Sequence, residues 1–520
     1  MDKKRLFYTI VCCTLFLTVV LAEGEVTQKA VPTQDPANTT LIPQNSNTTT
    51  TQTTTPKPKV DVINSALCKK CSCDKEYKQL DCSKKNLTSW FNDEEWSTLQ
   101  NGDLTFVTIN LQHNNLTEIP QLPAYPVENL YLGYNQIATI AIAAFSNLTE
   151  LTKLDLSHNK LTSKVMVPDV FKGKYSPSDY LPLEKLIELD LGYNELHNLD
   201  SDLFEHLPKL EILILCKNIF QVIDHLTETA IAGLTSLKTL DLSYMELEDL
   251  PDNLLHGPRD LENLILSGNL LDEIPDNMEL AINLKRLVLD ENPMADFDKE
   301  SVFPAFKNLQ YLSISYMPEL KRIAKGGLSN LQNLTELVAA NNPKLSYIDA
   351  EAFARATSNP EIFDYPPLEK LYLHNNNLSV LDRNLLRRWD KINIIDLSFN
   401  PWNCDCSNDW LIHTLMTQID STTPSVTKNV ECNLPTEWKG VPLMDLNSQK
   451  KELVCLSDSD TAHGGLILVG LLVGILVGVP ITMGGLILYR RGCFGLLNRN
   501  SGTSSRALYN RASFTDDFHI

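Results

Sequence analysis

A leucine-spaced motif recurs twelve times between residues 104 and 402. Its template is Leu-x-x-Leu-x-Leu-x-x-Asn-x-Leu, and the clearest copies begin at Leu151, Leu186 and Leu261. The other nine begin at Phe106, Val127, Leu210, Leu237, Leu284, Leu309, Leu334, Leu368 and Ile392. Most copies start 23 to 25 residues apart. Twelve copies in near register exclude chance, so this period limits the fold more than any other feature of the 520 residues.

The repeats predict a solenoid of the α/β class. Each unit supplies one short strand and a return segment, and only stacked units can bury the leucines in a continuous core. Asparagines at the ninth template position can bond backbone groups where the chain leaves each strand. They are Asn114, Asn135, Asn159, Asn194, Asn218, Asn269, Asn292, Asn342, Asn376 and Asn400. Met245 and Met317 stand there in two repeats, so we expect local irregularity at both.

Two repeat spacings are longer than the others, from Leu151 to Leu186 and from Leu334 to Leu368. Each contains about ten extra residues, rich in Pro, Tyr, Ser and Asp. We expect these residues to leave the solenoid as loops.

Cysteine clusters flank the repeats at both ends. Residues 68–103 begin with Cys68-x2-Cys71-x-Cys73-x8-Cys82, and residues 403–456 contain Cys404, Cys406, Cys432 and Cys455. An open solenoid needs caps to cover the leucines of its terminal repeats. A zinc site is the alternative, but a secreted chain favours disulfides, and each cluster of four allows three pairings.

Both ends of the chain carry targeting features. Residues 1–22 combine Lys3, Lys4 and Arg5 with an apolar run and a small-residue site at Ala22, which predicts a secretory signal peptide. Residues 464–489 contain no charged residue and precede Arg490 and Arg491. This predicts one transmembrane helix with the tail, 490–520, in the cytosol; a buried core helix is the alternative. The expected location is the plasma membrane as a single-pass type I protein.

The remaining segments are linkers, and the chain is acidic. Residues 23–67 are dense in Thr, Asn, Gln and Pro, which predicts a disordered, O-glycosylated segment. Residues 457–463 form a short juxtamembrane linker. The formal net charge of −20 repels nucleic acid, so we expect no nucleic-acid partner; it favours a basic partner or simply solubility.

The capped array resembles the ectodomains of Toll-type receptors, Slit-like proteins and leucine-rich-repeat adhesion molecules. Asn400-Pro401-Trp402-Asn403-Cys404-Asp405-Cys406 is the most specific motif, and the resemblance covers nearly all of residues 68 to 455. It implies a right-handed leucine-rich-repeat horseshoe with disulfide caps. It also implies the pairs Cys68–Cys73, Cys71–Cys82, Cys404–Cys432 and Cys406–Cys455. Many different tasks share this architecture, so the resemblance names a fold rather than a function.

Catalytic and cofactor motifs are missing from the sequence. It contains no Gly-x-Ser-x-Gly, His-Glu-x-x-His, phosphate-binding Gly-x4-Gly-Lys-Ser/Thr or EF-hand pattern. His113, His158 and His374 lie near predicted strand ends, but no second ligand type recurs at metal spacing. We therefore expect no enzyme activity, cofactor or metal.

The template places a set of side chains on the open face of the predicted sheet. Positions i+2, i+4 and i+6 point away from the leucine core, and i+7 follows at the strand end. The i+7 row is rich in aromatic residues, and β-branched residues gather on the middle strands. β-propensity alone is the alternative explanation, but we predict an exposed apolar, tyrosine-rich partner site. Its residues are Tyr131, Tyr193, Ile212, Ile214, Tyr244, Ile265, Val288, Tyr311, Tyr316 and Val338.

Two features suggest self-association. Cys216 is the ninth ectodomain cysteine, which suggests an intermolecular disulfide; a partly covered thiol is the alternative. Gly470, Gly474 and Gly478 share one face of the predicted membrane helix and allow close helix packing. A homodimer through either feature is a hypothesis.

Sequons for N-glycosylation limit where a partner can dock. They lie at Asn38, Asn47, Asn86, Asn115, Asn147, Asn333 and Asn377. The stretch from Tyr193 to Val338 contains only Asn333. A partner is therefore expected on the central part of the array.

Together these features predict a cell-surface recognition protein, either an adhesion molecule or a ligand-binding receptor or co-receptor. A protein ligand would bind the concave face. The alternative is a structural surface scaffold or matrix-organising protein without a signalling role.

Overall fold

A computed structural model describes residues 59–176, 179–297, 302–359, 362–455 and parts of 476–487. All of them belong to one compact unit, Lys59–Ile520. The predicted segments 1–22, 457–463 and 490–520 lie outside the described residues, as do Gly470, Gly474, Gly478, Asn38 and Asn47. Of the segment 23–67, predicted to be disordered, residues 23–58 also lie outside, but residues 59–67 are folded, with Val62 buried and a helix beginning at Ala66. Of the predicted span 464–489 only a few residues are described, and 479–484 are helical. Within the described parts, no helix is long and apolar enough to cross a membrane.

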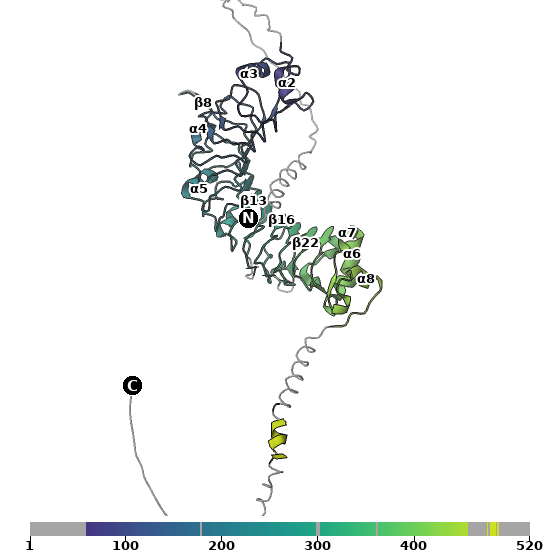
Figure 1. Cartoon of the computed structure of the whole chain (residues 1–520). Helices are drawn as coiled ribbons and strands as arrows, with labels where there is room; N and C mark the ends of the chain where they lie inside the picture. Colours follow the sequence, from purple (N-terminus) through teal and green to yellow (C-terminus); the bar gives the residue numbers. More distant parts are fainter. Residues whose placement is uncertain are drawn as a thin grey trace, which may run out of the picture. The chain divides into compact units, whose positions relative to one another are not determined.

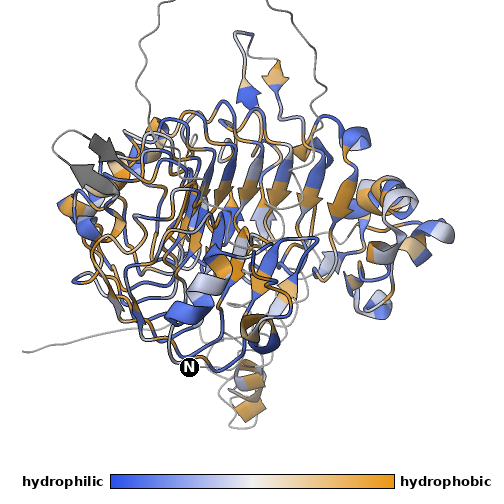
Figure 2. Ribbon diagram, turned by 90° about the horizontal axis from the view of Figure 1, so that it is seen from above, coloured by the Kyte–Doolittle hydropathy of each residue, from blue (hydrophilic) through white to orange (hydrophobic). Residues whose placement is uncertain are grey.

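One sheet of fourteen strands runs through the repeats and into the N-terminal cap (Figures 1 and 2). Its strands are, in spatial order, β1 (Ser72–Asp74), β2 (Gln79–Asp81), β3 (Thr108–Asn110), β5 (Asn129–Tyr131), β7 (Lys153–Asp155), β10 (Glu188–Asp190), β11 (Ile212–Ile214), β12 (Thr239–Asp241), β13 (Asn263–Ile265), β14 (Arg286–Val288), β16 (Tyr311–Ser313), β18 (Glu336–Val338), β22 (Lys370–Tyr372) and β23 (Ile394–Asp396). From β3 onward, every strand covers template positions i+2 to i+4 of one repeat. The predicted solenoid and its register are therefore confirmed.

The sheet strands pair in parallel from β2 to β23, and only β1 and β2 are antiparallel. Register aligns the central leucine of each strand with that of the next, as in Leu154 with Leu189. Parallel strands need a crossover connection, which the return segments supply. The strands from β2 to β23 therefore all end at the same edge of the sheet.

Return segments contain short strands and helices. The strands are β4 (Glu118–Ile119), β6 (Thr139–Ile140), β15 (Asp296–Phe297), β17 (Arg322–Ile323) and β19 (Tyr347–Ile348). The helices are α4 (Pro168–Phe171), α5 (His225–Ala232), η1 (Asp276–Leu280), η2 (Arg383–Leu385) and η3 (Trp389–Lys391). Asp224 caps α5 by accepting a hydrogen bond from the Thr227 amide.

Leucines of the template fill the core, and the asparagine row satisfies the backbone beside it. Asn159 shows the pattern: its Oδ1 accepts from the Ile137 amide at 3.0 Å, and its Nδ2 donates to the Leu132 and Leu156 carbonyls. All ten asparagines of the row are buried. The strands keep their register at the two methionine repeats, so the expected irregularity does not reach the sheet. Asn269 of the next repeat accepts from the Met245 amide, which explains the continuity.

Both long spacings form short antiparallel hairpins where unstructured loops were expected. The first contains β8 (Lys174–Ser176) and β9 (Asp179–Leu181), and the second β20 (Arg355–Ala356) and β21 (Phe363–Asp364). Each hairpin comes just before a strand of the main sheet. Both therefore belong to the part of the repeat that enters the sheet.

Disulfide-bonded caps close both ends. The N-terminal cap holds α2 (Ala66–Lys70) and α3 (Asp93–Gln100), and the C-terminal cap holds β24 (Trp402–Asn403), β25 (Cys432–Leu434), η4 (Cys406–Asn408), η5 (Leu411–Leu415), η6 (Thr436–Trp438), α6 (Met416–Thr422), α7 (Pro424–Thr427) and α8 (Leu443–Ser448). The structure contains disulfides Cys68–Cys73, Cys71–Cys82, Cys404–Cys432 and Cys406–Cys455. These are the pairs that the family resemblance implied.

Candidate functional site

A row of left-handed residues follows the strands of the sheet. Position i+7 has a φ between +52° and +66° in all twelve repeats. The row is His113, Tyr134, His158, Tyr193, Lys217, Tyr244, Gly268, Glu291, Tyr316, Asn341, Asn375 and Phe399. This conformation costs a non-glycine residue roughly 1–2 kcal/mol. Because every repeat adopts it at the same place, side chains of neighbouring repeats leave the backbone in the same way.

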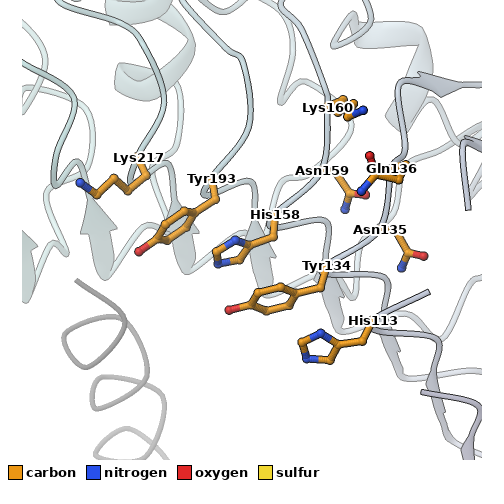
Figure 3. A pocket seen from close by; sticks show the side chains of 9 residues that line it. All are labelled: His113, Tyr134, Asn135, Gln136, His158, Asn159, Lys160, Tyr193 and Lys217. Carbon is orange, nitrogen blue, oxygen red and sulfur yellow. The ribbon is translucent and has the colours of Figure 1, made fainter. Parts of the chain in front are cut away.

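Aromatic rings stack along the first part of this row (Figure 3). Ring centroids are 4.3 Å apart between His113 and Tyr134, 3.9 Å between Tyr134 and His158, and 3.8 Å between His158 and Tyr193. The interplanar angles are all 22° or less. Stacking covers the ring faces and leaves ring edges and polar tips for a ligand.

A cation continues the row. Nζ of Lys217 lies 3.8 Å from the centroid of the Tyr244 ring. The Tyr244 hydroxyl donates to Oε1 of Glu291 at 2.6 Å, across the intervening repeat. Gly268 makes this reach possible, because a Cβ at that position would overlap the Tyr244 ring. We call the six i+7 residues of these repeats the stacked row: His113, Tyr134, His158, Tyr193, Lys217 and Tyr244.

A shallow hollow of about 540 Å³ opens beside the stacked row. Its walls come from three neighbouring template positions, i+7 to i+9, and Figure 3 shows the nine side chains. Lys160 and Lys217 are its charged residues, and no carboxylate lines it. A hollow with aromatic, amide and ammonium groups offers both apolar contact and hydrogen-bond donors.

His158 is neutral at physiological pH. Burial between two tyrosine rings, helped by the nearby His113, lowers its pKa to about 4. A neutral imidazole can both donate and accept a hydrogen bond. The centre of the stacked row therefore presents a polar, uncharged group.

The predicted partner residues divide into exposed and covered groups. Tyr316 is 43% exposed, and Tyr131, Tyr193, Tyr244, Ile212 and Val338 are half-buried. Ile214 lies on β11, and Ile265 and Val288 lie on the neighbouring strands β13 and β14, but all three are only 6 to 8% exposed. Strands lie about 4.8 Å apart, so large side chains on one face cover each other. The expected exposed apolar patch is therefore largely absent at these three residues.

Tyr311 is also held from within the protein. The guanidinium carbon of Arg286 lies 3.6 Å from the centroid of its ring. Burial raises the pKa of the Tyr311 hydroxyl. A predicted contact residue is thus already engaged by a cation from the neighbouring strand.

Buried carboxyls lie on the same sheet face in the middle of the array. Burial raises the pKa of Asp241 to about 6, opposed by hydrogen bonds from the Ser243 hydroxyl and amide. Asp290 also reaches about 6 by burial, although Ser313 and Ser315 donate to it. No sequence pattern singled these two out, because their burial depends on neighbouring strands.

Cys216 is buried, which argues against an intermolecular disulfide at this residue. Its residue is 2% exposed. A Cβ added at Gly192 would lie 2.9 Å from the Cys216 Sγ, so the neighbouring repeat packs directly on the sulfur. A covalent dimer would require that contact to open.

Five predicted glycosylation sites lie in the described region. Asn86, Asn115, Asn333 and Asn377 are exposed. Asn147 is half-buried, and its Nδ2 donates to the Leu122 carbonyl at 2.9 Å. Its amide nitrogen, the atom that a glycan would use, is already engaged.

The His, Cys, Asp and Glu side chains of the described residues do not group into a metal site. No cluster of three or more His, Cys, Asp or Glu side chains there could hold an ion. The histidines of the stacked row contact tyrosines instead.

Comparisons with known proteins define the class. The leucine-rich-repeat family model matches residues 106–161 and 126–173. Lumican of Bos taurus is 30% identical over 51% of this chain and 68% of its own length. Osteomodulin of Bos taurus is 31% identical, and the alignment covers 51% of this chain and 55% of osteomodulin. The chain belongs to the leucine-rich-repeat proteins with disulfide-bonded cysteine caps, and lumican and osteomodulin are among its relatives.

Solved structures give a weaker likeness. A structure of the Toll–Spatzle complex from Drosophila aligns with a TM-score of 0.44 at 21% identity, over 72% of this chain and 57% of that chain.

Proposed function

We propose that this chain is an extracellular recognition protein that docks a protein partner on the stacked row. The observation that carries the proposal is the exposed edge of that row with the 540 Å³ hollow beside it. Tyrosine buries a large area on binding at low entropic cost. A purely structural role would not require four successive repeats to stack their rings.

We further propose display on the plasma membrane as a single-pass type I protein. The supporting feature is the uncharged segment 464–489 followed by Arg490 and Arg491. The glycines at 470, 474 and 478 then provide a dimer contact within the membrane. The recognition we propose is adhesion, or ligand reception together with a signalling co-receptor.

The experiment uses the full-length chain on cultured cells and matched variants of the row. Proximity labelling on intact cells identifies proteins enriched around the wild type. Tyr134→Asn with Tyr193→Asn should remove them, because the rings are lost. Asn already occupies this left-handed position as Asn341 and Asn375, so the backbone tolerates it. Tyr77→Ala, at a tyrosine 71% exposed in the N-terminal cap, is the control.

A matrix-organising role is the second candidate, favoured by the relationship to lumican and osteomodulin. It predicts that the chain is recovered with extracellular matrix after cells are removed. It also predicts the same neighbours for wild type and the Tyr134→Asn, Tyr193→Asn variant. That pair of results would replace the recognition proposal with the matrix one.

A further inference from the structure

A second groove lies where the chain enters the last two sheet strands, at the edge opposite the stacked row. It consists of two hollows of about 560 and 490 Å³ that share Phe363, Tyr365, Leu386 and Arg387. Residues 362–369 lead into β22 and 383–391 lead into β23, whereas the stacked row follows the strands. The groove and the stacked row are therefore separate surfaces.

Three structural units build the larger hollow. The hairpin of the long repeat supplies Ile362, Phe363 and Tyr365, the return segment of the repeat that begins at Leu368 supplies Trp389, and the C-terminal cap supplies Trp410. The two indole rings pack with centroids 5.0 Å apart. Trp389 Nε1 donates to the Arg383 carbonyl at 2.7 Å, which fixes the segment between them. Ile362 is 48% exposed, so apolar surface remains open to a partner.

Positive charge concentrates beside these apolar walls. Residues 383–391 contain Arg383, Arg387, Arg388 and Lys391 against one acid, Asp390, in a chain of net charge −20. Arg388 is neutralised by Asp390, with its Nη2 2.7 Å from the carboxylate. Arg383 and Arg387 are exposed and form no ion pair within the described residues. They are the charged residues lining the larger hollow, and no acid lines it. The smaller hollow is lined by Arg387, Arg388 and Lys391 and by two acids, Asp364 and Glu369, so the basic residues of the groove still outnumber its acids.

Tyr365 lies inside the groove, within reach of charges of both signs. Burial raises the pKa of its hydroxyl, the Glu351 carboxylate raises it further, and Arg387 opposes the rise. The guanidinium therefore lies close enough to act on a ligand group held against the Tyr365 ring.

We propose that this groove binds an acidic protein segment in which a carboxylate side chain stands beside a large apolar one. Two guanidiniums without carboxylate partners match the carboxylates. The aromatic walls and Ile362 match the apolar side chain. A sulfated glycan would satisfy the arginines but would leave the apolar walls without contacts, so a peptide fits better.

The test measures binding of labelled probes to the full-length chain on cells. Four probes are used: 12-residue peptides alternating Glu with Phe, Gln with Phe, and Glu with Ser, and a heparin oligosaccharide. We expect the Glu–Phe peptide to bind more tightly than the other three. Binding should weaken with added salt, because the contact depends on charge.

Two charge-matched double variants separate the groove from general electrostatics. Arg383→Glu with Arg387→Glu should weaken Glu–Phe binding about tenfold or more. Lys164→Glu with Lys209→Glu changes the net charge equally at exposed sites away from the groove and should leave binding unchanged. Arg383→Gln with Arg387→Gln, which adds no repulsion, should also weaken binding.

Several results would overturn the proposal. They are failure of the Glu–Phe peptide to bind, equal binding of the Gln–Phe peptide, preference for heparin, or equal losses in both double variants. The Tyr134→Asn, Tyr193→Asn variant should keep full peptide binding. Loss of the partner in that variant with retained peptide binding would show that the two sites act independently.

Discussion

The two halves of the i+7 row share a backbone but differ in their side chains. From His113 to Tyr193 the rings stack on one another, and further along the row the Lys217 ammonium group lies over the Tyr244 ring. In the second half, Asn375 donates to Asn341 at 3.0 Å, while Phe399 is 58% exposed. Since both halves are left-handed at this position, the repeat supplies a row of attachment points. The side chains placed there decide whether the row becomes a recognition surface.

The largest expected effect comes from adding a methyl group at the one glycine of the row. Gly268→Ala combines left-handed strain with overlap on the Tyr244 ring and should lower the free energy of unfolding by about 3 kcal/mol. Asn341→Ala, in the second half, places alanine in the same left-handed conformation without that overlap. It should lower the free energy of unfolding by about 1 kcal/mol. Urea unfolding measures both. Equal losses would show that Tyr244 can move at no cost and that the stacked row is not rigid.

The second largest expected effect is on the pH dependence of stability and concerns Asp241, a carboxyl buried in the middle of the array. Because the pKa of Asp241 is raised to about 6, the folded state keeps the proton that the unfolded chain loses first. Stability should therefore fall as pH rises from about 4 to about 6, by about 3 kcal/mol in total for this group. Asp241→Asn should remove that fall, as measured by urea unfolding at pH 4 and pH 7. An unchanged pH dependence in the variant would contradict the burial.

A smaller effect concerns the stacked histidine. Tyr193→Asn uncovers one face of His158, so its pKa should rise from about 4 towards the ordinary 6.5. Nuclear magnetic resonance of the imidazole proton during a pH titration measures this. Phe399→Asn, at the same template position in the second half, should leave His158 unaffected. If the pKa of His158 stays near 4 in Tyr193→Asn, the stacking of Tyr193 is not what lowers it.

The smallest effect is at the exposed pair Arg388–Asp390. The Arg388 guanidinium lowers the pKa of Asp390 to about 2, so any stabilisation is present above the unfolded value of 3.8 and is lost as pH falls through 2. Arg388→Gln should return the pKa of Asp390 towards 3.8, as measured by a carboxyl titration. Salt should shrink the difference, because both groups are exposed. A shift that persists in high salt would indicate a second, buried cause.

Much of the fold is predictable because its signal is local and repeated. The Leu-x-x-Leu-x-Leu spacing defined every sheet strand from β3 to β23, and the asparagine row defined the hydrogen bonds beside it. The hairpins at 174–181 and 355–364 were expected only as loops. Their strands are three and two residues long, too short to show a periodic pattern.

The site was predictable only in outline. The i+7 aromatic residues could be counted from the sequence, but not their stacking, because ring contacts depend on the left-handed backbone of each repeat. The sequence pattern placed the apolar i+4 residues of the middle strands on the correct face of the sheet. It predicted them to be exposed, whereas they are buried. The burial of Ile214, Ile265 and Val288 depends on the side chains of adjacent strands, 23 or more residues away in sequence.

The sequence by itself determined the repeat number, the strand register, the positions of the caps and the row of residues at the strand ends. Each of these follows from spacing along the chain. The stacking of the rings and the burial of Cys216 against Gly192 come from the tertiary structure alone. So does the meeting of the hairpin, the return segment of the repeat that begins at Leu368 and the C-terminal cap around Arg383 and Arg387. The reason is physical: contact and burial depend on which side chains the stacking brings together, and spacing does not specify their final distances.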